Sequence, residues 1–166
     1  MSERSHTLQP VDLTPEAEVR TTIEHRRAYS LERCELKVYE TRQAARNIHL
    51  TFEGFTITSM LRGRKALHVD GEQRVLDYVP GQTVLVPHNV AMDIDFPDAT
   101  PWKPTQCTAL VIEQAHFTRQ LDYLNEQRPM PDGQAWTVDP NRAFLQNDEE
   151  LARLSDRMVR VLSGTD

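Results

Sequence analysis

The residues of this chain that could carry chemistry include two cysteines and six histidines. Cys34 and Cys107 each lie in strand-like sequence, so we expect reduced core thiols and not a disulfide or redox pair. His88 falls in a turn, and His68 precedes a hairpin turn, at a pocket mouth or on the surface. No serine, cysteine or lysine stands in a known nucleophile motif, and the sequence has no glycine-rich phosphate loop. These residues alone indicate no catalytic constellation.

A small basic cluster at 62–65 is the other candidate for chemistry. Arg62, Arg64 and Lys65 follow one another closely, and Arg74 lies across a predicted hairpin. Such a cluster is typical of an ordinary solvated face, and the functional alternative is an anchor for an anionic effector or a docking surface for another domain. The formal net charge of the chain is −6, from 19 basic and 25 acidic side chains, the wrong sign for a polyanion ligand. We therefore expect no nucleic-acid binding by this segment itself.

Length and hydropathy bound the class of protein. A chain of 166 residues fits one domain with a real hydrophobic core. No apolar run approaches the length of a membrane span, and the polar amino terminus does not resemble a secretory signal. We therefore expect a cytoplasmic protein.

The elements that must position any site are short strands. Residues 34–39 alternate between apolar and polar side chains, as in a half-buried strand. Asp70-Gly71 is a hairpin signal and Pro80-Gly81 a type II turn signal. Further strands are predicted at 48–52, 55–61, 66–69, 73–78, 83–86, 92–96 and 105–112. About eight strands at this spacing predict a closed antiparallel barrel or a two-sheet sandwich, and residues 20–30 are ambiguous between helix and edge strand.

The carboxy-terminal third changes to helical periodicity. Phe117, Leu121 and Leu124 share one face of a predicted helix, which Pro129 and Pro131 end. We expect the chain to divide into a mobile arm at 1–13, a barrel at 14–112 and a helical pair at 113–166.

A second helix is predicted between a capping-box-like start at 147–150 and a C-cap at Gly164. Four apolar residues recur along it at spacings of three, four and three. This seam would either pack on the barrel or pair with its copy in a second chain. The candidate dimerisation residues are Leu151, Leu154, Met158 and Val161.

Residues 77–96 resemble the second sequence motif of the cupin barrels. Gly81 and Pro87 match that motif, and Asn89 replaces a glycine at a position where asparagine tolerates the left-handed conformation. Met92 stands where the motif has a metal-binding histidine. The imidazole ligand of the motif is therefore replaced here by the soft thioether of Met92.

The first cupin motif should then lie upstream, with two histidines and a glutamate before a glycine. Counting back from Gly63 places Thr56 at the glutamate, Thr51 at the second histidine and His49 at the first. Threonine and methionine are poor ligands for a hard or borderline divalent ion, so we expect no metal and no cofactor. Whether His49 faces the interior stays open, because alternation buries its neighbours Ile48, Leu50 and Phe52 instead.

A degraded cupin barrel followed by two helices resembles the amino-terminal effector-binding and dimerisation domain of AraC-type transcription regulators. Residues 31–112 carry the likeness, including 59–63 and 78–81, and the helices extend it to Leu162. The resemblance implies a barrel cavity that binds a small-molecule effector, a mobile arm and a homodimer through the helices. Those regulators continue into two helix-turn-helix units, so we expect this chain to be a truncated sensor or a stand-alone module. DNA contact would then require a domain that this chain does not contain.

The sequence thus predicts a non-catalytic sensor whose effector fills the barrel. The residues expected to line its cavity are Thr56, Thr58, Met60, Tyr78, Met92 and Ile94, with His49 as a further candidate. The alternatives are a metal-dependent cupin enzyme, an isomerase or dioxygenase, and a dimeric interaction module without a ligand.

Overall fold

The computed structural model describes residues 24–69, 74–146 and 148–164. The predicted arm at 1–13 and the Asp70-Gly71 turn lie outside this part of the chain. Its strands and helices follow one another in this order: β1 (Glu24–Ser30), β2 (Cys34–Thr41), β3 (Ala45–Thr51), β4 (Phe55–Arg62), β5 (Lys65–Val69), β6 (Arg74–Tyr78), β7 (Thr83–Val86), β8 (Ala91–Phe96), β9 (Thr105–Ile112), α1 (Gln114–Gln127), β10 (Phe144–Gln146) and α2 (Glu149–Ser163).

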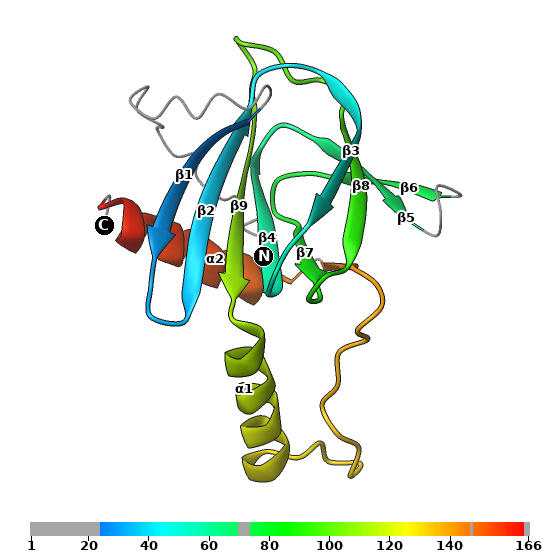
Figure 1. Cartoon of the computed structure of the whole chain (residues 1–166), viewed down its shortest axis with the longest axis vertical. Coiled ribbons are helices and arrows are strands. Elements are labelled where there is room, and N and C mark those ends of the chain that lie inside the picture. The colour runs from blue at the N-terminus through cyan, green and yellow to red at the C-terminus, as the bar shows by residue number, and fades with distance from the viewer. Residues whose placement is uncertain (1–23, 70–73, 147, 165–166) are drawn as a thin grey trace, which may run out of the picture.

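The strands form two antiparallel sheets that pack face to face (Figure 1). One sheet has the order β1-β2-β9-β4-β7-β10, and the other has the order β3-β8-β5-β6. Side chains of both sheets meet in one core, in which Met60 and Val86 of the first sheet pack with Ile94 and Phe96 of the second. This confirms the prediction of a mainly β, cupin-like fold followed by helices, with the two-sheet sandwich as the alternative that is present. The pair of facing sheets is called the barrel below.

Two tight turns have the backbone that the sequence predicts, and a third depends on a glycine for space. Gly81 has a φ of 89° and Asn89 a φ of 58°, as the type II turn and the cupin-like turn require. Gly63 has a φ of 80°, and a Cβ added there would lie 2.8 Å from Thr105 Oγ1 and 2.9 Å from Thr105 Cα. Only glycine therefore fits between β4 and β5 without a shift of β9.

Two strands lie where the sequence pattern was ambiguous or silent. The ambiguous stretch at 20–30 contains an edge strand, β1, which pairs with β2 from Glu24 to Ser30. The predicted helical pair at 113–166 is interrupted by β10, which returns to the barrel and pairs with β7. Three residues give too short a pattern for alternation to predict a strand.

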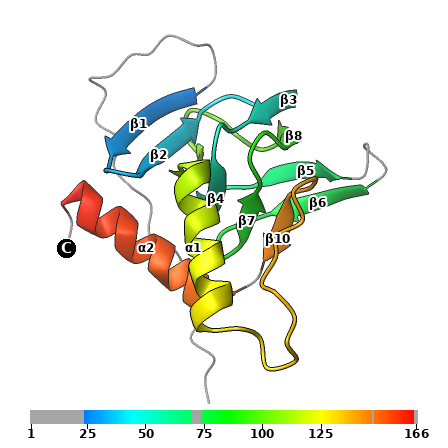
Figure 2. The same ribbon diagram turned by 60° about the horizontal axis from the view of Figure 1, so that its bottom comes forward.

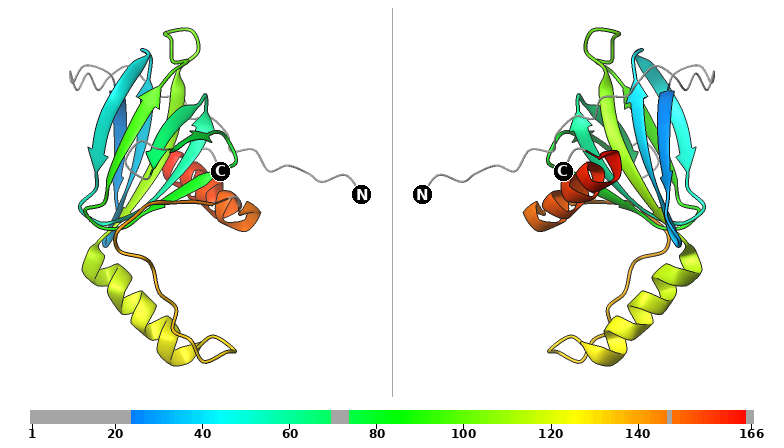
Figure 3. Two further views of the ribbon diagram at one scale, coloured as in Figure 1. Left: turned by 90° about the vertical axis from the view of Figure 1, so that its right-hand side faces the viewer. Right: turned by 90° about the vertical axis from the view of Figure 1, so that its left-hand side faces the viewer.

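The two helices sit differently on the barrel. α1 projects away from the sheets (Figure 3), none of its residues is buried, and its Phe117 ring stacks on Phe55 of β4 at 3.9 Å between centroids. α2 lies across the outer face of the six-stranded sheet (Figure 2), where Ala152 packs on Leu61. Among the described residues, neither helix is long and apolar enough to cross a membrane.

The ends of α2 show why the helix occupies these residues. Asp148, not Asn147, is its N-cap, and the Asp148 side chain accepts a hydrogen bond of 2.9 Å from the Leu151 N–H. Gly164 ends the helix in the left-handed conformation with a φ of 73°, as predicted. The predicted helix start was therefore one residue too early.

Candidate functional site: a cavity between the sheets

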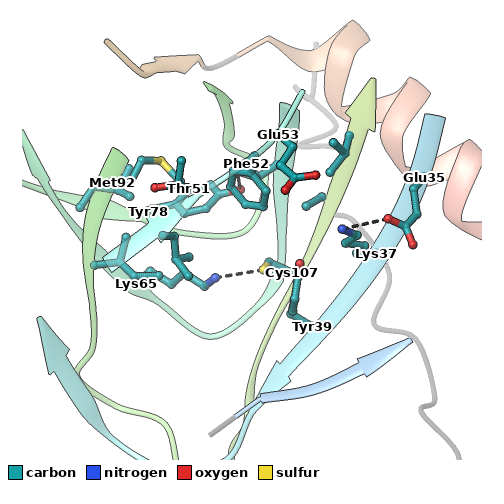
Figure 4. A pocket seen from close by; sticks show the side chains of 16 residues that line it. Glu35, Lys37, Tyr39, Thr51, Phe52, Glu53, Lys65, Tyr78, Met92 and Cys107 are labelled. Atoms are coloured by element: carbon teal, nitrogen blue, oxygen red, sulfur yellow. Dashed lines mark hydrogen bonds and ion pairs between the residues drawn. The ribbon is translucent and has the colours of Figure 1, made fainter. Parts of the chain in front are cut away.

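A cavity of about 440 Å³ lies inside the barrel, between the two sheets. Figure 4 shows side chains from strands of both sheets pointing into it. Its size and mixed lining are typical of a small-molecule site.

The most buried part of the cavity carries polar groups. Tyr78 is 2% exposed, and its hydroxyl lies 3.0 Å from Thr58 Oγ1. Lys65 is 6% exposed, and its Nζ donates to Cys107 Sγ at 3.0 Å. Burial raises the pKa of Tyr78 well above its ordinary value, the nearby Cys107 adds to the rise, and the Thr58 hydrogen bond acts in the opposite direction. Tyr78 is therefore a neutral phenol that can donate or accept a hydrogen bond.

The rim of the cavity is charged and more exposed. Lys37 and Glu35, two residues apart on β2, form an ion pair of 2.9 Å between Nζ and Oε2. Thr51 and Glu53, at and just after the end of β3, line the same rim and are exposed (Figure 4). A ligand would pass these groups to reach Lys65 and Tyr78.

The remaining wall of the cavity is largely apolar. Leu50 and Phe52 contribute from the β3 end, Leu67 from β5, and Met92 and Ile94 from β8. Such a wall can bury the hydrocarbon part of a ligand, which contributes roughly 25 cal/mol per Å² of apolar surface removed from water.

Of the residues predicted to line the cavity, four do so. Thr58, Tyr78, Met92 and Ile94 face it. Thr56 and Met60 are fully buried on the same strand but do not line it. The Thr56 hydroxyl donates to the Gly54 carbonyl at 3.0 Å, and Met60 belongs to the core.

His49 does not face the cavity. Its side chain is 64% exposed, and its Nδ1 lies 2.7 Å from Asp93 Oδ1 on the outer face of the four-stranded sheet. The neighbours Ile48, Leu50 and Phe52 instead pack on the core, as strand alternation requires. The expectation that His49 could be a pocket residue is corrected in favour of alternation.

The same observation corrects how the first cupin motif fits this chain. Counting back from Gly63 aligned His49 and Thr51 with the two histidines of the motif. The side chains that point inward are instead those of Leu50 and Phe52. A slip of one residue moves every side chain of a strand to the other face. Apolar residues thus occupy the inward positions, and a divalent ion would find no imidazole or carboxylate there. In residues 24–69, 74–146 and 148–164, no group of three or more His, Cys, Asp or Glu is placed to hold a metal ion.

Lys65 was missed because the sequence placed it in a basic surface cluster. The structure divides that cluster, since the Arg64 guanidinium lies outside the cavity and pairs with Asp77 at 2.7 Å and Asp98 at 2.8 Å. A signal was nevertheless present, because Lys65 and the core residue Leu67 are two apart and share one face of β5.

The cavity residues of β2 were missed for a different reason. Glu35, Lys37 and Tyr39 are the polar set of a strand whose apolar set, Leu36 and Val38, is fully buried. Alternation alone makes the apolar set face the interior. Here that set occupies the opposite, outer face of the sheet, across which α2 runs, so the polar set lines the cavity.

The four candidate dimerisation residues are not equally exposed. Leu154 and Val161 are each 54% exposed, and Leu151 and Met158 are partly buried. The face of α2 that packs on the barrel instead carries Ala152, Asp156 and Val159. Leu154 and Val161 therefore form an apolar edge on the far side of the helix.

Comparison with known proteins links the whole arrangement to one family. Residues 34–166 match the sequence model described as "AraC-type transcriptional regulator N-terminus". No curated protein matches the chain by sequence.

Solved structures share the fold. ToxT from Vibrio cholerae is similar with a TM-score of 0.56 and 12% identity, over 81% of this chain and 54% of ToxT. A second ToxT structure, bound to (E)-4-(8-methylnaphthalen-1-yl)but-3-enoic acid, has a TM-score of 0.55 and 14% identity, over 81% of this chain and 55% of that one. A cupin superfamily protein from Desulfitobacterium hafniense has a TM-score of 0.46 and 15% identity, over 66% of this chain and 97% of that one. The chain spans about half the length of ToxT.

Proposed function

The chain belongs to the family of AraC-type transcriptional regulator N-termini, and from this membership we propose that it senses a small molecule in its barrel and signals through a dimer. The observation that supports this proposal best is the cavity of about 440 Å³ with buried polar groups at one end and an apolar wall. A related structure, ToxT, binds an organic acid. For this chain, the effector would be a small, partly polar molecule.

The connection from β9 to α1 supports a route from the cavity to the helices. Cys107, Ala109 and Val111 of β9 line the cavity, and α1 begins at Gln114, two residues after the strand ends. The intervening Glu113 is tied to the barrel, because its N–H donates to the Arg33 carbonyl at 3.1 Å. A ligand that binds one arrangement of β9 and α1 more tightly than another would shift the population toward it.

The proposed dimer uses the apolar edge of α2. Leu154 and Val161 are seven residues apart, so they lie on one side of the helix two turns from each other. Paired with a second copy, Leu151 and Met158 would complete the seam. Two helical turns form a short interface, and α1, whose Tyr123 is 62% exposed, would add to it.

We propose that the barrel is not an enzyme. Leu50 of β3 and Phe52 just after it point inward, and Met92 stands on β8 where a cupin enzyme has a histidine. Binding and release of an effector do not require the metal-binding side chains that are replaced here. Transcription control by the complete regulator, in the cytoplasm and through a separate DNA-binding domain, is part of the same proposal.

A thermal-shift screen of the purified chain against a metabolite collection tests the sensor proposal. We expect at least one compound to raise the melting temperature in a concentration-dependent way. Ala109→Leu, which fills the cavity from β9, should abolish the shift. Ala44→Leu, an exposed loop substitution of the same size, should leave the shift intact. The proposal would be contradicted if no compound raised the melting temperature, or if the same rise were seen with the Ala109→Leu variant.

A further inference from the structure

Lys65 is a lysine whose charge lies inside the barrel. The residue is 6% exposed, it lines the cavity, and its Nζ lies 3.0 Å from Cys107 Sγ. The same Nζ stands 4.8 Å from the centroid of the Phe96 ring. Sulfur is a weak acceptor, and an aromatic face attracts a cation without neutralising its charge.

In the part of the chain that the structure describes, the Lys65 ammonium therefore has no carboxylate partner. Among the described residues, no carboxylate forms an ion pair with it, although Lys37 at the rim is paired with Glu35. The adjacent Arg64 points outward and satisfies its guanidinium with Asp77 and Asp98. A buried charge without a counter-ion is costly, and a bound anion would offset that cost.

We infer that Lys65 binds the anionic head group of the effector, and that the effector is a monocarboxylic acid with an apolar body. This inference rests on the proposed sensor function. Tyr78 is the cross-strand neighbour of Lys65, and when Thr58 donates to the Tyr78 oxygen, the Tyr78 hydroxyl is left to donate to a second carboxylate oxygen. Leu50, Phe52 and Met92 then enclose the hydrocarbon part.

The charges of the rim exclude more highly charged ligands. Glu53 lines the cavity away from Lys65, and the Glu35 charge at the same rim is offset by Lys37, so a second negative group on the ligand would meet the Glu53 carboxylate without gaining a free cation. A phosphate dianion favours several cationic donors, and one lysine with one hydroxyl donor matches a single negative charge better. A monoanion bound with its head group toward Lys65 satisfies both constraints.

A pair of matched probes tests the inference on the unaltered chain. Calorimetric titration compares 2-naphthoate with 2-naphthamide, which has nearly the same shape but no charge. We expect the carboxylate to bind at least about tenfold more tightly, as a charge-assisted hydrogen bond requires. Equal affinities, or tighter binding of the amide, would overturn the inference. So would the absence of binding by naphthoate, octanoate and benzoate alike.

Two lysine variants locate the effect. Lys65→Met keeps most of the length of the side chain and removes its charge, and it should abolish the preference for naphthoate over naphthamide. Lys37→Met, at the rim, should keep most of the preference. If Lys65→Met keeps the preference, Lys65 is not the anchor.

The outcomes separate this inference from the sensor proposal. Metabolite hits that are neutral and depend on an open cavity would retain the sensor function and overturn the carboxylate class. If neither probe and no metabolite binds, both fall together, and the barrel is a structural module without a ligand.

Discussion

The Tyr78 hydroxyl and Thr58 Oγ1 lie 3.0 Å apart inside the barrel, where Tyr78 is 2% and Thr58 6% exposed. They join the two sheets, because Thr58 belongs to β4 and Tyr78 to β6. Thr58 Oγ1 also lies 3.5 Å from the Val84 carbonyl, so it has a second acceptor within its own sheet. The pair thus both faces the cavity and links the two sheets across the core.

Tyr78→Phe removes one hydroxyl of this link and leaves the ring in place. We expect a loss of about 1 kcal/mol in the free energy of unfolding, measured by urea denaturation, because Thr58 keeps an acceptor at Val84. Tyr123→Phe on α1, where the residue is 62% exposed, is the control and should change stability by less than about 0.5 kcal/mol. Equal stabilities of the two variants would show that the link contributes nothing.

The raised pKa of Tyr78 predicts a loss of stability in alkali. Burial holds the proton on the folded side chain, whereas the unfolded chain releases it at about pH 10. Above that pH the folded state binds the extra proton, so the stabilisation is complete below about pH 10 and is lost as the pH rises. Denaturation between about pH 9 and about pH 11 should show a steeper decline for the native chain than for Tyr78→Phe. Parallel declines would contradict the buried phenol.

Gly63 should tolerate alanine less well than another glycine of similar backbone conformation. Gly63 and Gly133 have φ values of 80° and 77°, so a side chain strains both. At Gly63 the new Cβ would also approach Thr105, whereas at Gly133 it would meet nothing within 4 Å. Gly63→Ala should therefore cost at least about 1 kcal/mol more than Gly133→Ala in thermal or urea unfolding. A smaller difference would mean that β9 yields easily at Thr105.

The proposed dimer predicts that charge on the outer edge of α2 produces monomers. Leu154→Glu with Val161→Glu places two carboxylates on exposed positions, so the barrel should stay folded while light scattering reports the mass of one chain. Ala152→Glu, on the buried face of the same helix, should instead destabilise the fold by several kcal/mol. A dimer that survives the double substitution would assign the interface to another surface.

Alternation and turn chemistry predicted the strands of this fold well, because both depend on neighbouring residues. Gly81 and Asn89 have the positive φ that their turns require, and Met92 and Ile94 face inward as the pattern of β8 predicts. Neither face of β2 is fully open to solvent, however, because one face lines the cavity and α2 runs across the other. Which set of β2 side chains faces the cavity depends on where α2 packs, and that is decided far away in the sequence.

The site could be predicted where strand alternation and register decide which side chains face inward. Tyr78 and Thr58 follow from the barrel register, but Lys65 was grouped with Arg64 because adjacent basic residues resemble one surface patch. Lys65 opens β5 and Arg64 directly precedes it, and successive side chains along an extended chain point in opposite directions. His49 shows the reverse error, since counting along a motif with substituted residues misplaced the register by one, and alternation gave the correct face.

The stacked rings of Phe55 and Phe117 hold the start of α1 against the barrel and provide a point about which the helix could pivot. The rings meet in the first turn of a helix of 14 residues, which at 1.5 Å per residue extends about 20 Å from the barrel. A small tilt of β9 about this point is multiplied along the helix, so that its far end sweeps a wider arc than the strand that moved it. If the barrel senses an effector as proposed, the filling of its cavity would in this way be conveyed over a distance that no atom of the ligand spans.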